Sequence, residues 1–191
     1  MSNFFEIESI PWPLLAVALL LVIWLGYRIL GRRGESLEGV IAEISFDRIK
    51  GLVIPSADEG EILVDYLLLT PHGLLILEVK NIQGVVFGGD KMQNWTVIND
   101  QRRYTFSNPQ PALYDRIAAV RQIVRQVPVA GRIVFLDGAE FTKGVPGLVC
   151  NLAELSREFA EPDKDAAKVK IEAFRPHWEL IRKEALTAGS T

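Results

Sequence analysis

Three side chains suited to phosphate chemistry lie close together between Glu61 and Asn81. Asp65 and Glu78 each stand in an aliphatic run, and Lys80 follows Glu78 by two positions. Two adjacent carboxylates bind a hard divalent cation such as Mg²⁺ or Mn²⁺, which prefers oxygen ligands. A lysine on the same face would stabilise negative charge on a phosphate. The spacing alone allows this chemistry but does not single it out.

A β-hairpin is the element that must position these side chains. Residues 62–70 and 74–80 are predicted strands, and Pro71-His72-Gly73 is the turn between them. Side chains alternate faces along a strand, so Glu78 and Lys80 share one face. In a hairpin closed at this turn, Asp65 lies near the level of Glu78. Burying such charges is costly unless a cation or a substrate compensates them.

The same residues also have a plainer interpretation. Glu78 and Lys80 could form ion pairs at the exposed end of a strand, with no chemistry attached. Several basic residues could surround the site and contact phosphates, or they could be ordinary surface charges balanced by acids. These residues are Lys91, Arg102, Arg103, Arg116, Arg121 and Arg125.

The neighbouring segments predict an α/β sandwich around a mixed sheet flanked by helices. A helix carries a core stripe of Leu37, Val40, Ile41 and Ile44, in a segment that ends with Gly51 and Pro55. Short strands follow at 84–88, 95–99 and 103–106, and a helix opens at Asn108-Pro109. Buried strands are expected at 133–136 and 148–150, a short helix at 152–159, and a helix at 165–186 with a kink or break before Pro176.

The amino-terminal part predicts a membrane anchor. Residues 10–30 hold one charge, Arg28, and as a helix they would span roughly 31 Å, about the thickness of a hydrocarbon core. Arg32 and Arg33 follow this segment, whereas Glu6 and Glu8 precede it. The positive-inside rule then predicts a single-pass protein with its amino terminus outside and the rest in the cytoplasm, as in a bacterial inner membrane.

The composition of the chain limits its number of domains, its binding partners and its cysteine chemistry. The chain of 191 residues is 49% hydrophobic, enough for one core plus appendages. Its net charge of −3 is not typical of a nucleic-acid-binding protein, although a local basic patch remains compatible with it. A single cysteine, Cys150, excludes an intramolecular disulfide and a cysteine-based zinc site, and it is predicted to be a buried thiol.

The motif Asp65…Glu78-Val79-Lys80 resembles the core of the PD-(D/E)xK phosphodiesterases. Residues 31–127 more closely resemble the NERD (nuclease-related) domain, in which an amino-terminal membrane segment is common. The features that carry this resemblance are Gly34-Glu35, the strand around Asp65, residues 73–81, Gly84, Gly88, Trp95 and Asn108-Pro109.

This resemblance implies an αβββαβ core and a nuclease that hydrolyses DNA or RNA with Mg²⁺ or Mn²⁺. Asp65 and Glu78 would bind the metal, with the Val79 carbonyl as a third ligand and Lys80 as the catalytic lysine. A glutamate of the first helix would join them: the Gly-Glu pair favours Glu35, whereas the helix phase favours Glu38, which we rank first.

The expected organisation has five parts: a tail at 1–9, a transmembrane helix at 10–30, a hinge at 31–34, the NERD-like domain at 35–160 and a helical extension at 161–191.

Two other functions stay open. One is a membrane-tethered module that keeps the nuclease fold and binds nucleic acid without efficient catalysis. The other is a structural membrane protein whose polar cluster is only ion pairing.

Overall fold

A five-stranded mixed sheet organises the domain in the computed structural model, which describes residues 36–55 and 60–188. The strand order is β1-β2-β3-β7-β9. The first three strands are antiparallel neighbours, and β7 and β9 run parallel to β3. Their bounds are β1 (Asp47–Pro55), β2 (Glu61–Thr70), β3 (Gly73–Lys80), β7 (Val129–Phe135) and β9 (Val149–Cys150). The predicted α/β class with a mixed sheet is confirmed.

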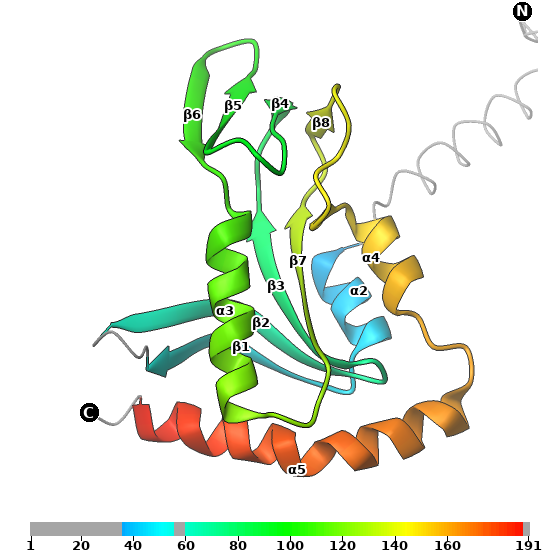
Figure 1. Cartoon of the computed structure of the whole chain (residues 1–191). Helices are drawn as coiled ribbons and strands as arrows, with labels where there is room; N and C mark the ends of the chain where they lie inside the picture. The colour runs from blue at the N-terminus through cyan, green and yellow to red at the C-terminus, as the bar shows by residue number, and fades with distance from the viewer. Residues whose placement is uncertain (1–35, 56–59, 189–191) are drawn as a thin grey trace, which may run out of the picture. The chain divides into compact units, whose positions relative to one another are not determined.

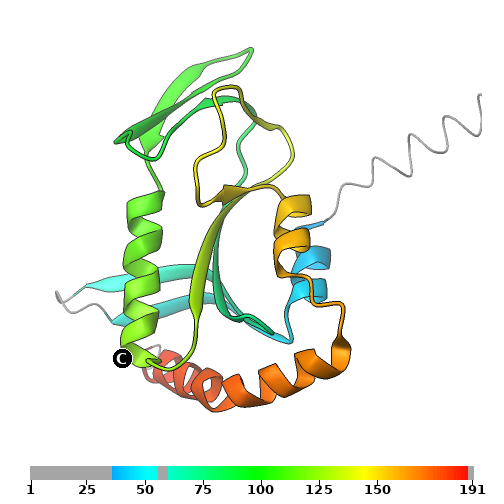
Figure 2. The ribbon, with the colours of Figure 1, turned by 45° about the vertical axis from the view of Figure 1, so that its right-hand side comes forward.

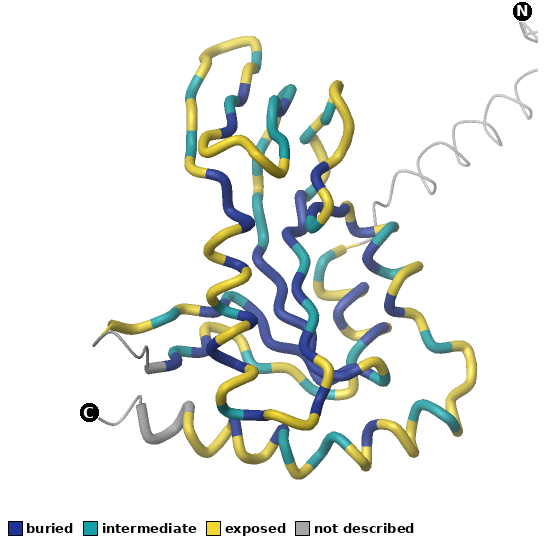
Figure 3. The backbone as a smooth tube through the Cα atoms, viewed as in Figure 1, coloured by how far each residue is buried: buried dark blue, intermediate teal, exposed yellow. Residues whose placement is uncertain are grey.

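Helices cover both faces of this sheet (Figures 1 and 2). On one face, α2 (Leu37–Ile44) and α4 (Leu152–Phe159) pack against Leu68, Leu75 and Leu77. On the other, α3 (Gln110–Ile123) and α5 (Lys164–Ala188) share a core with Leu67, Leu74 and Ile76. The central strands are therefore buried from both sides, as Figure 3 shows.

A smaller sheet combines three strands from the segment between β3 and α3 with one strand that follows β7. Its strand order is β6-β5-β4-β8, with bounds β4 (Gly84–Phe87), β5 (Asn94–Ile98), β6 (Arg103–Ser107) and β8 (Ala139–Phe141). Trp95 of β5 is fully buried and contacts the rings of Phe135 at the end of β7 and Phe141 of β8. These aromatic contacts join the smaller sheet to the core of the main one. The predicted strands at 84–88, 95–99 and 103–106 are confirmed.

Polar side chains begin several helices, including the helix predicted to open at Asn108. The Ser36 hydroxyl accepts a hydrogen bond from Gly39 N at the start of α2. The Asn108 side chain accepts from Gln110 N before α3. Asn151 and Glu154 form a capping box at α4. Each satisfies an amide that the helix itself leaves unpaired.

One prediction about local structure is wrong, and a second, of a kink or break before Pro176, is wrong as to the break. Residues 47–55 form β1 and do not belong to the end of the preceding helical segment. No break occurs before Pro176, because α5 continues through it. Proline removes one helical hydrogen bond, but Ile171 and Trp178 on either side are buried in the core, and this packing outweighs the local preference.

The carboxyl-terminal helix belongs to the same core as the sheet. Ile171, Trp178 and Ile181 of α5 pack with residues of β1 and β2, and Trp178 Nε1 donates a hydrogen bond to Asp47 Oδ2 at 2.9 Å. Residues 35–191 accordingly group as one unit.

None of the helices within residues 36–55 and 60–188 is long and apolar enough to cross a bilayer. The predicted anchor at residues 10–30 and the hinge at 31–34 lie outside the described residues.

Candidate functional site

The β2–β3 hairpin brings Asp65 to the strand that carries Glu78 and Lys80. Its paired residues run from Thr70–Gly73 at the turn to Tyr66–Leu77. One step further in this register places Asp65 opposite Glu78. Here Asp65 Oδ2 accepts a hydrogen bond from Val79 N at 3.1 Å. The backbone pairing between β2 and β3 has ended at this level, so the Asp65 side chain supplies the acceptor for the Val79 amide.

The neighbouring strand β1 is distorted at the level of Asp65. Gly51 of β1 has a φ of 65°, and it lies across from Asp65 between the pairs Lys50–Tyr66 and Leu52–Val64. A residue with a side chain adopts this backbone conformation at a cost, whereas glycine does not.

The side chains of β2 change faces at the same level. Val64 and Leu67 both pack in the core under α3, whereas Tyr66 packs under α2. In a regular strand Val64 and Tyr66 would share a face, so the alternation slips by one residue at Asp65. In Figure 1 the outer part of the β1–β2 pair extends to the left, past α3.

Glu78 lies between two cations. Lys80 Nζ is 2.7 Å from its Oε1, and Arg116 Nη1 is 3.3 Å from its Oε2. The Glu78 side chain is 8% exposed, compared with 30% for Lys80. Burial of this carboxylate is tolerable because both oxygens are paired with positive charge. The two strand residues therefore share one face and meet, as predicted.

Arg116 also fastens β2 to this cluster. It projects from α3, and its Nε donates to the Leu63 carbonyl at 2.6 Å. Leu63 precedes Asp65 by two residues. A single guanidinium therefore connects α3 with both strands of the hairpin, using two of its fixed donor directions.

Glu38 lies with different partners. Its carboxylate is 2.6 Å from Arg48 Nη1, and it accepts a hydrogen bond from the Tyr66 hydroxyl at 3.1 Å. Its helix, α2, packs on the face of the sheet opposite α3, which carries Arg116. Glu35, the alternative first-helix acid, lies outside the described residues.

The donor types of this cluster suit a divalent metal ion, but the side chains do not form a complete set of ligands. Asp65, Glu78 and the Val79 carbonyl supply oxygens of the kind that Mg²⁺ and Mn²⁺ prefer. Both Glu78 oxygens are engaged by cations, however. Within residues 36–55 and 60–188, no group of three or more His, Cys, Asp or Glu side chains could hold a metal.

The model of the family described as "Nuclease-related domain" (NERD) matches residues 34–136 of this chain. That range covers more than half of the sequence, from the start of the domain to the strand β7 beside β3. The chain belongs to the NERD family.

One relative of this NERD chain is the "Uncharacterized protein pXO1-01" of Bacillus anthracis, which is 27% identical over 63 residues. The aligned part is 33% of this chain and 30% of the relative, so the chain spans less than a third of that protein. No solved structure matches.

In the sequence, Arg116 is one of several basic residues of the NERD domain that could contact phosphates. Its position contained a signal: Arg116 is three residues after Leu113 and four before Val120, both of which are buried. A basic residue beside a buried helical stripe needs an acidic or carbonyl partner below it. The other predicted phosphate contacts do not gather at Glu78; Arg121, for example, donates to the Val129 carbonyl.

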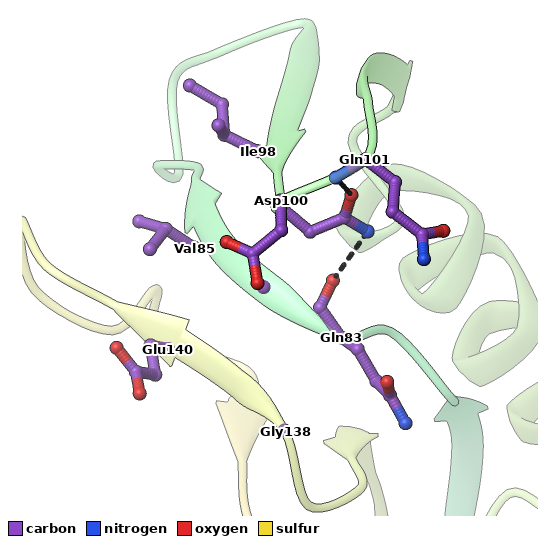
Figure 4. Close-up of a pocket in the computed structure, with 9 residues that line it drawn as sticks. Gln83, Val85, Ile98, Asp100, Gln101, Gly138 and Glu140 are labelled. Atoms are coloured by element: carbon purple, nitrogen blue, oxygen red, sulfur yellow. Dashed lines mark hydrogen bonds between the residues drawn. The ribbon is translucent and has the colours of Figure 1, made fainter.

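Two further features of the NERD domain can be set aside as centres of phosphate chemistry. Cys150 is buried as predicted, and this burial raises the pKa of its thiol to about 12, so it is not a thiolate nucleophile at neutral pH. Figure 4 shows a hollow in the smaller sheet, where the Asn99 amide donates to the Gln83 carbonyl. Its charged lining residues, Asp100 and Glu140, are both acidic and would repel a phosphate.

Proposed function

We propose that this NERD-family protein hydrolyses phosphodiester bonds in nucleic acid with the help of Mg²⁺ or Mn²⁺. The observation that carries the proposal is the joining of β2 to the Glu78-Val79-Lys80 segment. Asp65 binds the Val79 amide, and Lys80 pairs with Glu78 on the face under α3. This supports the proposal, because Asp65 contacts the strand segment that carries Glu78 and Lys80.

Asp65, Glu78 and the Val79 carbonyl are the groups that would hold the metal ion. When bound, such an ion polarises the phosphate and lowers the pKa of a coordinated water. Glu38 is a weaker candidate, because its carboxylate already binds Arg48 and Tyr66.

Lys80 is the residue best placed to act on the substrate directly. Its amine is anchored by Glu78 and its side chain is 30% exposed, so it can face a phosphate at the surface. A fixed positive charge there stabilises the negative charge that grows on the phosphate oxygens in the transition state. The ion pair with Glu78 limits the movement of the amine.

A digest of labelled substrates tests the proposal. The full-length chain is incubated with single- and double-stranded DNA and RNA in Mg²⁺ or Mn²⁺. We expect cleavage by the unaltered chain, and a loss of at least about a hundredfold in Lys80→Met and Asp65→Asn. Lys168→Met, a change at an exposed lysine of α5, is the matched control and keeps full activity. Cleavage that survives both site variants refutes the assignment.

A binding module without catalysis is the second candidate. It is favoured by the pairing of both Glu78 oxygens with cations, which balances this carboxylate without a metal ion. Such a module would retain labelled nucleic acid equally in Mg²⁺ and in EDTA and would cut none of it. The same samples, run on a native gel, separate this outcome from hydrolysis.

We also propose that residues 10–30 anchor the protein in a bacterial inner membrane, with the NERD domain in the cytoplasm. The support is the length and apolar character of this segment and the arginines that follow it. In intact spheroplasts, external protease should leave the domain uncut. Extraction at alkaline pH should leave the protein in the membrane pellet, and its release would contradict the anchor.

A further inference from the structure

Arg116 competes for the atoms that a metal ion would need. Its Nη1 lies 3.3 Å from Glu78 Oε2, while Lys80 holds Oε1. A divalent cation on Oε2 would stand within a few ångströms of the guanidinium. Two positive charges at that distance repel each other, most strongly in a partly buried site.

The side chain of Arg116 can leave this position without being trapped in the core. It is 21% exposed, and it reaches Glu78 from α3 and not from the strands that carry the acids. Arginine stays charged at all relevant pH values, so it cannot lose a proton to relieve the repulsion. Only movement away from Glu78 relieves it.

We infer that Arg116 takes the place of a divalent cation on Glu78, and that a metal ion binds this carboxylate by displacing Arg116. The inference rests on the proposed function, since it concerns the same acidic pair. It makes Arg116 a residue that sets the metal affinity of the site and links that affinity to the contact between α3 and β2.

Titration of the full-length chain with Mn²⁺, followed by calorimetry in the absence of nucleic acid, tests this inference. Arg116→Gln should bind Mn²⁺ about tenfold more tightly than the unaltered chain, because one hydrogen bond to a charged group no longer competes. Glu78→Gln should lose binding. Arg121→Gln, on the same helix but bonded to the Val129 carbonyl, should leave the affinity unchanged.

Arg116→Lys separates the effect of the positive charge near Glu78 from the effect of the hydrogen bond that ties Arg116 to the Leu63 carbonyl. It keeps the positive charge near Glu78 but lacks the Nε that binds the Leu63 carbonyl. The inference expects an Mn²⁺ affinity near that of the unaltered chain. If Arg116→Lys instead binds as tightly as Arg116→Gln, then the lost tether is responsible and the inference is overturned.

A measurement on the unaltered chain covers the case in which Arg116→Gln does not fold. Magnesium is titrated while the Nε–H resonance of Arg116 is followed by NMR. The signal should shift and exchange faster with solvent as Mg²⁺ binds. Binding of Mg²⁺ at Glu78 with an unchanged Arg116 signal overturns the inference.

The outcomes also distinguish this inference from the nuclease proposal. Tighter Mn²⁺ binding by Arg116→Gln, with no cleavage by any variant, supports displacement of Arg116 and refutes hydrolysis. Cleavage by the unaltered chain, with equal or weaker Mn²⁺ binding by a folded Arg116→Gln, supports hydrolysis and refutes displacement.

Discussion

Asp65 and Glu78 are held in the fold by different means. Glu78 depends on charge, because two cations surround a nearly buried carboxylate. Asp65 depends on a neutral hydrogen bond, because its partner is the backbone amide of Val79. The loss of a side chain therefore has a different consequence at each position, and only at Asp65 can the negative charge be removed while the structural contact is kept.

Substitution of Asp65 should separate structure from activity. Asp65→Asn keeps an oxygen that accepts from Val79 N, so the free energy of unfolding should change by less than about 1 kcal/mol while cleavage is lost. Asp65→Ala leaves that amide without an acceptor and should destabilise the fold by about 1–3 kcal/mol. Urea denaturation of both variants gives the comparison. Equal stability of the two would show that the hydrogen bond contributes nothing.

Asp90 should make stability depend on pH. Its Oδ1 accepts hydrogen bonds from Gln110 Nε2 and Gly147 N, each at 2.9 Å, and these bonds hold the pKa of the Asp90 carboxyl below its usual 3.8. A lowered pKa means that the folded state favours the charged form. Its contribution is complete above the ordinary pKa and is lost as the pH falls through the lower, folded value.

Thermal melts between pH 2.5 and 7 check this expectation. The unaltered chain should melt above Asp90→Ala at pH 7, and the difference in melting temperature should shrink below about pH 4. Asp115→Ala, which removes an exposed carboxylate from α3, controls for the change in net charge. A difference that grows on acidification would contradict the assignment.

At the scale of elements, the turn between β2 and β3 fixes the register on which the site depends. Gly73 has a φ of 114°, and a Cβ there would lie 2.3 Å from the Pro128 carbonyl oxygen. That oxygen is needed where it is, because it accepts from Leu74 N at 2.8 Å. The hairpin is thereby seated against the start of β7.

Gly73→Ala should therefore destabilise the domain by about 1–3 kcal/mol through backbone strain, with a further loss from the clash. The matched control is Gly144→Ala, where φ is 93° but no atom lies within 4 Å of the added Cβ. Urea denaturation should show a larger loss at Gly73. Equal losses would mean that the clash of the added Cβ with the Pro128 carbonyl oxygen does not affect stability.

The sequence predicts elements best where the interacting residues are close along the chain. The hairpin, its turn and the level of Asp65 with Glu78 follow from alternation and turn chemistry within about twenty residues. The strand β1 was missed because the kink at Gly51 interrupts alternation: Ile49 and Leu52 both pack in the core under α3. The apolar residues of β1 therefore do not follow the two-residue period by which a strand is predicted.

The partners of the site charges were harder to predict. Arg116 and Glu78 are 38 residues apart, with three strands of the smaller sheet between them in the sequence, and no local pattern indicates such a contact. Helix phase predicted that Glu38 points away from the α2 core stripe. Helix phase could not predict that Arg48 and Tyr66 would bind this carboxylate. Both residues lie on strands, and their positions relative to the helix depend on how the sheet packs against it.

At the scale of the whole molecule, α5 completes the core although the family match ends at residue 136. Trp178 is 1% exposed, packs in the core with residues of β1 and binds Asp47. The region matched to the NERD family thus lacks part of the apolar surface that buries its own first strand.

Truncation of Trp178 should show how much the domain depends on α5. Trp178→Ala should lower the free energy of unfolding by about 3–5 kcal/mol, since it leaves a large cavity and removes a hydrogen bond to Asp47. Leu180→Ala, two residues away and 41% exposed, should cost about 0.5 kcal/mol or less. Urea denaturation compares them. Similar small losses would show that α5 is only an appendage.

The contact between Trp178 and Asp47 joins positions 131 residues apart. A ribosome makes β1 well before α5. The first strand therefore stays incompletely covered until the residues of α5 have also emerged from the ribosome.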